Sequence, residues 1–487
     1  MVPQGVRHPA TVPVRSCHDR VVGPIDPAFL DEAVDLLGAS HVVVDPDVVA
    51  GYVADWTGRF RGSTPAVLRP GSTEEVAALV GLCRRHGVAL ALQGGRTGLS
   101  GGTVPLQGEV VCSLVRLSTL EPDGPAGQIT AGAGVPIARL QEAASALGWA
   151  YGVDLASRDS ATVGGSVATN AGGIRVLRYG DTRAQLLGVS AVLGNGRVVT
   201  HLGGLLKDNT GYDLAGLLCG SEGTLGVVTA ARLSLVRASP ERVVALLAFD
   251  TVGAALGATG ELRASLGALS AVELFLRPGL SLVCEHQGLP DPFDAPHAAY
   301  LLVEASDDRD PTDELSEAVD ALGAVAEVAV AQDRARAAEL WRYREGHTEA
   351  INRLGPPHKL DVSVPISALG EFVERVTPVV ASLRPAAALW LFGHAADGNV
   401  HVNVTGIDPD DDQVDEAVFA LAASLGGAVS AEHGIGTAKR RWLHLSRSDD
   451  EIAAFRAIKS ALDPDKILNP SVLLPPAEEG SGATDPS

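Results

Sequence analysis

The chain is 487 residues long, 46% of its residues are hydrophobic, and its formal net charge is −21. This length is enough for two or three domains with cores of their own. The negative charge argues against nucleic acid or an anionic membrane surface as the main partner, because the overall field repels phosphate, although a small anion could still bind in a locally basic pocket.

Cysteines and apolar runs bear on the cellular location of the protein. The five cysteines are scattered without a Cys-x-x-Cys pair, which is typical of reduced thiols rather than of a disulfide framework or a zinc ribbon. Residues 1–27 lack the basic start and apolar run of a signal peptide. Arg384 and Pro385 interrupt the apolar stretch near Val379–Phe392, so no run reaches membrane-spanning length. We therefore expect a cytoplasmic protein without a membrane span.

Regular elements are predicted from about residue 61, after an N-terminal segment (residues 1–60) without a clear pattern. Ser72 and Glu75 predict a capping box that opens an amphipathic helix, and a buried strand at Val88–Leu92 leads into a glycine-rich loop. The later predicted elements are strands at Glu109–Leu117, Gln128–Ala131 and Gly226–Val236, a helix from Pro136 with Leu147 on its apolar face, and a hairpin around Gly194-Asn195-Gly196. We interpret residues 61–238 as one domain.

The pattern changes near Pro240, where glycine becomes rarer. Strand-like runs now alternate with amphipathic helices, which indicates a second α+β domain (residues 239–430) built on an antiparallel sheet. The predicted strands are Val243–Phe249, Leu269–Leu276, Tyr300–Ala305, Leu360–Val364, Ala387–Phe392 and Val400–Val404. A C-terminal segment (residues 431–474) follows with a helix near Asp450–Leu462, and we expect residues 475–487 to be a disordered tail.

Three glycine-rich segments lie within the first domain. They are QGGRTGLSGG (residues 93–102), TVGGSVATNAGG (residues 162–173) and GSEGTLG (residues 220–226). The first follows a strand but has no helical stretch behind it, which argues against a Rossmann dinucleotide fingerprint. It suits a loop whose successive backbone N–H groups cradle an anion at close range. One such loop could be a plain mobile turn, but three in one domain favour a nucleotide site.

The ordered motifs resemble a known flavoprotein family. QGGRTGLSGG, TVGGSVATNAGG, LRYGDTR, LKDNTGYDL and GSEGTLGVVT resemble the flavin domain of the vanillyl-alcohol-oxidase/p-cresol-methylhydroxylase family, and FGHAADGNVHVNV, VSAEHGIGTAKR and ILNP are similar to its D-2-hydroxy-acid dehydrogenase branch. The resemblance runs from about Pro65 to Pro470. It implies an α+β fold: a two-part FAD-binding domain of the p-cresol-methylhydroxylase type, and an antiparallel-sheet α+β cap domain that lays the substrate against the flavin ring.

The resemblance also implies which residues hold FAD. The implied cofactor-binding residues are Gly94, Gly95, Arg96, Thr97, Gly98, Leu99, Gly101, Asp154, Ser160, Thr162, Gly164, Gly165, Ala168, Asn170, Gly172, Glu222, Gly226, Val228 and Asn469. Family members with covalent FAD carry a His or Cys in the matching loops. Residues 94–102 and 154–173 contain neither, so we expect non-covalent FAD. Arg96 departs from the family pattern, as does Ser157-Arg158-Asp159.

A histidine hairpin is predicted in the second domain. Asp397-Gly398 is a favoured two-residue turn, which would place His394 opposite His401 on the side of the sheet that also carries Asn403. Ala396, where the family usually has Gly, would then precede the turn. Two opposed imidazoles can grip a metal ion, but two histidines that merely end an exposed hairpin are the simpler interpretation of these residues alone.

The Glu432-His433 pair adds a carboxylate and a third imidazole between small residues. Two histidines and one carboxylate suit Zn, Mn or Fe in an open catalytic site. The resemblance implies that His394, His401 and Glu432 bind a divalent metal, with zinc as the first choice, and that His433 is the catalytic base.

A set of cations could hold the substrate. Arg344 and Thr348 lie four apart on a predicted helix (Arg334–Leu354), and Lys359 opens the next strand. Such charges are usually solvated, but the resemblance makes this segment look like the substrate segment of D-2-hydroxyglutarate dehydrogenases, with Arg for one carboxylate and Lys for a second. Asn403 and His433 complete the implied substrate-binding set. His347 stands where we expect an apolar residue, which would change the shape of the pocket.

The resulting hypothesis is a FAD-dependent dehydrogenase that oxidises a D-2-hydroxy acid, best D-2-hydroxyglutarate, to the 2-oxo acid. The metal would acidify the hydroxyl, His433 would take its proton, and the Cα hydrogen would pass to the flavin as hydride. Electrons would then go to another acceptor, such as an electron-transfer flavoprotein, a quinone or a cytochrome. The alternatives are D-lactate or glycolate as substrate, an oxidase that reduces oxygen, and a catalytically silent flavin electron-transfer module. A homodimer is compatible with the sequence.

Overall fold

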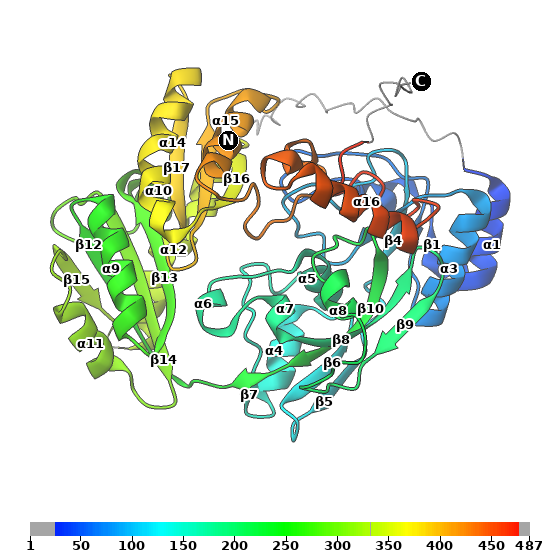
Figure 1. Ribbon diagram of the computed structural model, residues 1–487, viewed down its shortest axis with the longest axis horizontal. Helices are drawn as coiled ribbons and strands as arrows, with labels where there is room; N and C mark the ends of the chain where they lie inside the picture. The colour runs from blue at the N-terminus through cyan, green and yellow to red at the C-terminus, as the bar shows by residue number, and fades with distance from the viewer. Residues whose placement is uncertain (1–24, 332, 477–487) are drawn as a thin grey trace, which may run out of the picture.

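The computed structural model describes residues 25–331 and 333–476, which form two lobes (Figure 1). Residues 1–24, Gln332 and residues 477–487 lie outside the described residues, and with them most of the predicted tail and the start of the N-terminal segment. The lobe on the right of Figure 1, which runs from blue through cyan to the green strands β8–β10, is the first domain, and the lobe on the left, from green to yellow, is the second. The fold is the expected one: a two-part α+β domain followed by an α+β domain on an antiparallel sheet.

Two sheets make up the first domain. The four-stranded sheet is mixed, with the order β1 (Val42–Val43), β2 (Val67–Leu68), β4 (Val110–Ser113) and β3 (Leu90–Gln93). The five-stranded sheet is antiparallel, with the order β5 (Leu120–Asp123), β6 (Gln128–Gly132), β10 (Gly226–Ser234), β8 (Leu186–Leu193) and β9 (Val198–His201). A small ribbon pairs β7 (Trp149–Ala150) with β11 (Val236–Arg237).

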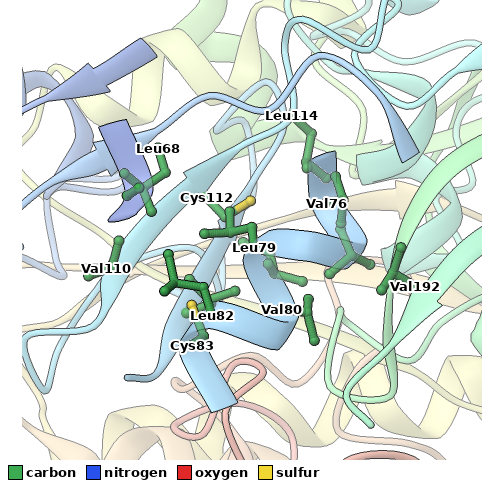
Figure 2. Close-up of a cluster of buried hydrophobic side chains, with 14 of the residues drawn as sticks. Leu68, Val76, Leu79, Val80, Leu82, Cys83, Val110, Cys112, Leu114 and Val192 are labelled. Carbon is green, nitrogen blue, oxygen red and sulfur yellow. The ribbon is translucent and has the colours of Figure 1, made fainter. Parts of the chain in front are cut away.

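Helix α3 (Thr73–His86) packs on the four-stranded sheet through Val76, Leu79, Val80 and Cys83, the predicted apolar face (Figure 2). Ser72 caps the helix by accepting the Glu75 N–H at 3.1 Å. The Glu75 carboxylate instead accepts the N–H of Gly71, so the predicted reciprocal capping box is incomplete. Helix α1 (Pro27–Leu37) contributes Phe29, Ala33 and Leu37 to the same core. Part of the N-terminal segment is therefore built into the first domain.

The remaining helical elements of this domain are short. They are η1 (Ala39–His41), α2 (Pro46–Val49), η2 (Ala50–Tyr52), α4 (Ile137–Ser145), α5 (Val163–Thr169), α6 (Val176–Tyr179), α7 (Thr182–Gln185) and α8 (Leu214–Leu218). Three predictions are corrected here. The second glycine-rich segment is not wholly a loop, because it starts with α5. Helix α4 ends before Leu147, which is 39% exposed. Strand β4 is shorter than Glu109–Leu117.

The second domain is built on one seven-stranded antiparallel sheet. Its order is β15 (Glu327–Val330), β12 (Glu241–Phe249), β14 (Ala299–Asp307), β13 (Leu269–Leu276), β17 (Ala388–His394), β18 (Asn399–Thr405) and β16 (His358–Ser363). Six of these strands were predicted. Strand β15 was missed because it is a half-exposed edge strand with no continuous apolar run.

Helices cover this sheet unequally. One face is covered along its length by α9 (Val252–Ser265), α11 (Thr312–Asp320), η3 (Ile366–Ala368), α14 (Leu369–Leu383) and α15 (Asp412–Ser424). The other face carries α10 (Arg277–Gln287), α12 (Arg334–Glu345) and α13 (His347–Asn352). The single helix predicted at Arg334–Leu354 is thus two helices, which meet at Gly346, a poor helix former.

The C-terminal segment returns to the first domain, as Figure 1 shows in orange and red. It contains η4 (Arg440–Leu445) and α16 (Asp449–Leu462). The Leu90 N–H donates to Ile467 at 2.7 Å and the Asn469 N–H donates to Leu90 at 2.9 Å, so this segment adds to the edge of β3. Among the described residues, no helix is long and apolar enough to cross a membrane.

Candidate active site

A cavity with about 680 Å³ of empty space, mouth included, lies in the first domain. Its walls come from the end of β3, the first glycine-rich loop, α5, the loop before β10 and the returning C-terminal segment. Ten of the residues singled out from the sequence line it: Gly94, Gly98, Gly164, Gly165, Ala168, Glu222, Gly226, Val228, His433 and Asn469. The three glycine-rich segments therefore enclose one space.

The other implied cofactor residues lie around this cavity without lining it. Arg96 points to the N-terminal segment, where it donates to the Gly51 carbonyl and lies over the Tyr52 ring. Asp154 forms ion pairs with Arg158 and Arg175. Residues Gly95, Thr97, Leu99, Gly101, Ser160, Thr162, Asn170 and Gly172 are also outside the lining.

The glycines serve two purposes. A Cβ at Gly95 would collide with the Ser160 carbonyl, and one at Gly94 with the Thr162 hydroxyl, so these glycines let the first two segments pack together. In contrast, a Cβ at Gly98 would meet nothing within 4 Å, and one at Gly165 only a hydroxyl at 3.3 Å. Only the second pair fits the predicted cradle, in which the missing Cβ leaves space for a ligand.

Three buried polar atoms that lack hydrogen-bond partners among the described residues indicate that this domain binds a polar ligand. Gln93 Oε1, Thr162 Oγ1 and Ser166 Oγ are buried without a hydrogen-bond partner among the described residues. Such groups cost free energy unless a partner is supplied. Gln93 lines the cavity, and the Thr162 hydroxyl lies against the loop that lines it. The donor and acceptor set of this space therefore fits a nucleotide-type cofactor.

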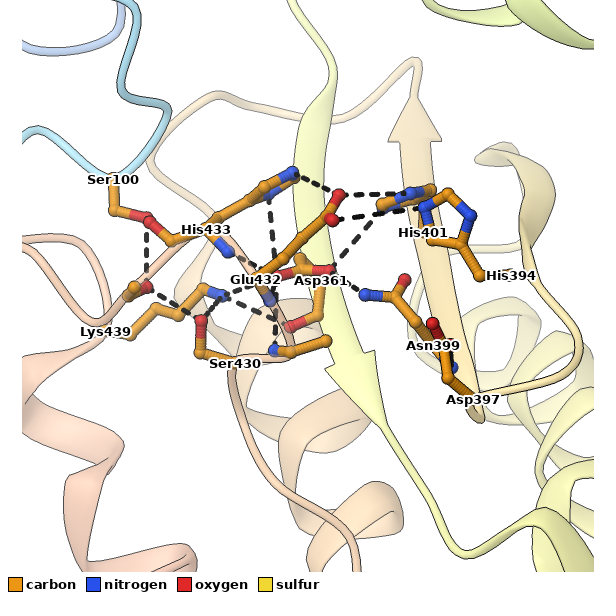
Figure 3. A network of polar contacts seen from close by, with 12 residues as sticks. Ser100, Asp361, His394, Asp397, Asn399, His401, Ser430, Glu432, His433 and Lys439 are labelled. Carbon is orange, nitrogen blue, oxygen red and sulfur yellow. Dashed lines mark hydrogen bonds and ion pairs between the residues drawn. The ribbon is translucent and has the colours of Figure 1, made fainter. Parts of the chain in front are cut away.

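Three imidazoles and one carboxylate meet where the two domains face each other (Figure 3). The Glu432 carboxylate lies 3.9 Å from His394 Nε2, 3.6 Å from His401 Nε2 and 3.6 Å from His433 Nε2. Two ligands at about 2.1 Å from a tetrahedral ion are separated by about 3.4 Å. The separations of the carboxylate from the three rings are close to this value, and Asp361, His401, Glu432 and His433 offer ligand atoms within 4.8 Å of one another, which is compatible with a divalent metal.

Two further carboxylates lie at the opposite nitrogens of the histidines. His394 Nδ1 is 2.6 Å from Glu273, its partner across the β13–β17 ladder. His401 Nδ1 is 3.5 Å from Asp361, its partner across β16–β18, and His433 Nδ1 is 3.7 Å from the same carboxylate. A carboxylate behind a histidine fixes the ring and directs Nε2 outward, which is the usual support of a metal-binding histidine.

Asp361 and Glu273 were missed at the sequence level. Asp361 also accepts the N–H groups of Ala431, Glu432 and His433 at 2.9–3.2 Å, so it holds the turn that presents the last two side chains. Each is the single acidic residue of a largely buried strand, HKLDVS and LSAVELFL. Because unpaired acids are rarely buried in a sheet, that pattern was the signal that could have found them.

The predicted register of the histidine hairpin is wrong, although His394 and His401 still lie on the same face of the sheet. Residues 395–398 form a four-residue turn, so Ala396 lies within the turn, and His394 pairs with Asn399 while His401 pairs with Phe392. The shift is two residues, which preserves the face of every side chain. His394 and His401 therefore meet diagonally, with ring centroids 5.4 Å apart. Gly398 ends the turn with a positive φ of 82°, and a Cβ there would collide with the Val364 carbonyl.

The cluster has strongly shifted acidities. Burial opposes the charged form of His394, but Glu273 holds its pKa well above the usual value. The same opposition appears at Glu432, where burial raises the pKa and the neighbouring His394 and His433 lower it well below the usual value. For His401 burial prevails and lowers the pKa. Strong shifts with identifiable charged partners are typical of functional sites.

His433 connects the cluster to the cavity, since it lines the cavity and lies against Glu432. Its loop is held from both domains. The Glu222 carboxylate accepts the N–H groups of Ile435 at 2.8 Å and Gly436 at 2.7 Å. From the other side, Lys439 Nζ donates to the Asp361 carbonyl at 3.2 Å and to Ser430 Oγ at 3.0 Å (Figure 3).

The predicted substrate residues are spread over two places. Arg344 is buried, with Nε 2.8 Å from Glu273 and its guanidinium over the Phe392 ring. Thr348, in the next helix, is exposed. Lys359 and Asn403 are cross-strand partners on the face that carries the histidines. His347 is fully buried between Phe275 and Phe392, and its Nδ1–H donates to the Arg344 carbonyl at 3.0 Å; burial lowers its pKa to about 3, so it is a neutral packing residue.

Comparisons with known proteins agree with this architecture. Residues 64–201 match the family described as "FAD binding domain", and residues 238–473 match "FAD linked oxidases, C-terminal domain". The chain is 39% identical to a D-2-hydroxyglutarate dehydrogenase of Xanthomonas citri pv. viticola, over 91% of this chain and 96% of that protein. It is 34% identical to a D-2-hydroxyglutarate–pyruvate transhydrogenase of Saccharomyces cerevisiae, over 87% and 89% of the two chains.

Solved structures share the fold at low identity. A p-cresol methylhydroxylase with bound substrate superposes with a TM-score of 0.74 at 16% identity, over 91% of this chain and 96% of that one. An alkyldihydroxyacetonephosphate synthase superposes with a TM-score of 0.73 at 17% identity, over 94% and 87%. These matches concern the arrangement of the two domains.

Proposed function

This chain belongs to the FAD-linked oxidase family of the vanillyl-alcohol-oxidase/p-cresol-methylhydroxylase type, and we propose that it is a metal-assisted dehydrogenase of a D-2-hydroxy acid, with D-2-hydroxyglutarate as the preferred substrate. The observation that carries the proposal is His433. This residue lines the cavity of the first domain and also contacts the carboxylate at the centre of the histidine cluster. A substrate held at the cluster would thus lie next to a cofactor in the cavity.

FAD, bound non-covalently, would supply the hydride acceptor. The protein's part is to enclose it: Gly98 and Gly165 leave room at the cavity wall, and Gln93, Thr162 and Ser166 offer unpartnered polar atoms. Glu222 and Asn469 shape the other side of the cavity, since Asn469 accepts the Leu92 N–H at 2.8 Å and donates to the Glu222 carbonyl at 2.7 Å.

His394, His401 and Glu432 would hold the divalent metal, with Zn the first candidate and Mn or Fe the others. When bound, such an ion acidifies a coordinated hydroxyl group. Asp361, His401, Glu432 and His433 offer ligand atoms within 4.8 Å of one another, a set that includes Asp361 and omits His394. We favour His394, because its Nε2 faces Glu432 while Asp361 is occupied by three backbone N–H groups and supports two rings from behind.

His433 is the proposed base. Its Nδ1 faces Asp361, which orients the ring, so Nε2 is the atom that would take the hydroxyl proton. Lys359 and Asn403 lie on the same face of the sheet and would bind the second carboxylate of a dicarboxylate. Arg344 would bind a carboxylate through the part of its guanidinium not used by Glu273, and Thr348 would assist from the next helix.

Two alternatives within the family keep the oxidation of a 2-hydroxy acid by the flavin but change the substrate or the electron acceptor. D-lactate or glycolate would replace the dicarboxylate if Lys359 does not bind substrate, and oxygen would replace a protein or quinone acceptor in an oxidase. A catalytically silent flavin module is disfavoured by the complete histidine cluster. A cytoplasmic location, a homodimer, and an electron-transfer flavoprotein, quinone or cytochrome as acceptor remain part of the proposal.

Anaerobic reduction of the bound flavin tests the proposal directly. We expect D-2-hydroxyglutarate to bleach the flavin absorption faster than D-lactate or glycolate, and the L-enantiomer to leave it unchanged. Rapid bleaching by D-lactate with no response to D-2-hydroxyglutarate would replace the proposed substrate. No bleaching by any of these acids in protein with full flavin and metal content would refute the dehydrogenase proposal.

A further inference from the structure

Lys359 presents an ammonium group to which the described part of the chain offers no acceptor. Its Nζ atom is buried and has no hydrogen-bond partner among the described residues, and burial lowers its pKa to about 8. The contact that the structure does give it is the ring of Trp56, whose centroid is 4.9 Å from Nζ. A buried cation without an acceptor is costly, so this position suits an anion that arrives from outside.

Trp56 belongs to a segment of the first domain, Asp55–Gly62, that the sequence left without a role. The segment is fastened to the first glycine-rich loop and the residues after it. A Cβ at Gly101 would lie 2.8 Å from the Phe60 ring, which shows how closely that ring covers the loop. Directly after the segment the Ser63 N–H donates to the Pro105 carbonyl at 3.0 Å, and within the segment the Asp55 carboxylate accepts the Phe60 N–H at 3.0 Å.

The same segment is tied to the second domain. Arg59 Nη2 lies 3.2 Å from Asp415 of α15, and the other oxygen of Asp415 lies 2.6 Å from His358 Nδ1. His358 immediately precedes Lys359 in β16, the edge strand of the sheet. Thr57, Arg59, Ser100 and Lys359 line one shared cavity at this edge. The segment thus spans both domains beside the unpartnered ammonium.

We propose that Asp55–Gly62 is a wall of the substrate pocket and that Trp56 is a positioning residue that selects dicarboxylates by holding the Lys359 ammonium ready for the second carboxylate. This inference rests on the proposed function of Lys359. An aromatic face attracts a cation without engaging its N–H donors, whereas an acidic partner would occupy them. Trp56 therefore stabilises the charge, keeps water from it and leaves its donors to the substrate. Trp56 is 55% exposed, and the residues that follow it, Thr57 and Arg59, line the cavity beside Lys359.

The test compares Trp56→Leu and Trp56→Phe in the flavin- and metal-loaded enzyme. For Trp56→Leu we expect kcat/KM for D-2-hydroxyglutarate to fall about three- to tenfold, mainly through KM, because the cation–π contact is lost. Activity on D-lactate should change less than about twofold, and Trp56→Phe should restore most of the loss. Trp149→Leu, which replaces a partly buried tryptophan of β7, an element that Figure 1 shows well away from β16, is the matched control and should leave the ratio of the two substrates unchanged.

A double variant separates this inference from the proposed function. In Lys359→Met protein, adding Trp56→Leu should cause no further loss on D-2-hydroxyglutarate, because the two residues act as one unit. If Lys359→Met is harmful and Trp56→Leu is not, or if Trp56→Leu harms both substrates equally, the inference about Trp56 is wrong and the role of Lys359 stands. If Lys359→Met itself leaves the substrate preference unchanged, the dicarboxylate proposal fails and the inference fails with it.

Discussion

The two faces of strands β16, β17 and β18 carry opposite kinds of side chains, although both faces are buried. One face presents Leu360, Val362, Val400, Val402 and Val404 to helices α14 and α15. The other presents Lys359, Asp361, His394, His401 and Asn403 to the first domain. Successive residues of β16 and β18 thus belong alternately to a core and to a candidate active site, whereas on β17 the face of His394 also carries Trp390 and Phe392, which pack into the core under α10, α12 and α13.

The difference lies in how each face is stabilised. On the apolar face any side chain of suitable size and shape contributes by leaving water. On the polar face each charge depends on a particular neighbour: Glu273 on His394 and Arg344, and Asp361 on three backbone N–H groups. Lys359 is the exception, because its Nζ has no acceptor among the described residues. The polar face is therefore specific in its geometry, and substitutions on the two faces should have separable effects.

The largest expected effect is at the metal ligands. Glu432→Ala or His394→Ala should abolish turnover while the flavin spectrum stays intact, because these side chains belong to the cluster and do not line the cavity. Elemental analysis for the metal and a measurement of flavin content, both on the same preparation, check that the metal is lost and that the flavin is retained. A His394→Ala protein with full activity and no bound metal would show that the cluster is structural.

Replacement of the proposed base, His433, should lower the activity nearly as much. His433→Ala is expected to lower the rate of flavin reduction about 10²- to 10⁴-fold, since no other group would take the proton. Metal and flavin should both remain bound, which distinguishes this variant from the ligand variants. Stopped-flow reduction under anaerobic conditions gives the rate, and a rate near that of the unmodified protein would assign the base elsewhere.

Lys359→Met should affect substrate choice rather than chemistry. We expect a loss of about 10- to 150-fold in kcat/KM for D-2-hydroxyglutarate, the value of one charge-assisted hydrogen bond, and little change for D-lactate. Because burial lowers the pKa of Lys359 to about 8, the ammonium is charged below that pH and neutral above it. The dicarboxylate preference of the unmodified enzyme should therefore decline as the pH rises through about 8. A pH-independent preference would contradict this role.

The smallest expected effects are at Val402 and Asn403, successive residues of β18 whose side chains lie on opposite faces of the sheet. Val402→Ala should lower the free energy of unfolding by about 2 kcal/mol through lost burial, with unchanged kcat/KM in the folded enzyme. Asn403→Ala should do the reverse, lowering kcat/KM at little cost in stability. Denaturant unfolding and steady-state kinetics measure the two quantities, and equal effects of both variants on activity would erase the proposed distinction.

Much of this organisation could be predicted from the sequence. The alternation of Val400, Val402 and Val404 with polar residues indicated which face is core, and that held even though the hairpin register was wrong by two residues. Local turn preference favoured Asp397-Gly398, whereas the turn spans residues 395–398 and Gly398 packs against the Val364 carbonyl. The roles of Asp361 and Glu273 could not be predicted from the sequence, because they depend on cross-strand partners far away in the chain. Trp56 could not be identified from the sequence, because its contact with Lys359 joins the two domains.

The central claim is that the polar face of the cap sheet and the flavin cavity act together on one substrate. The most direct measurement is anaerobic reduction of the flavin by D-2-hydroxyglutarate before metal removal, after chelation and after restoration of zinc. The account predicts rapid reduction, then none while the flavin remains bound, then recovery. Equal reduction rates in all three samples, with metal loss confirmed by elemental analysis, would contradict it.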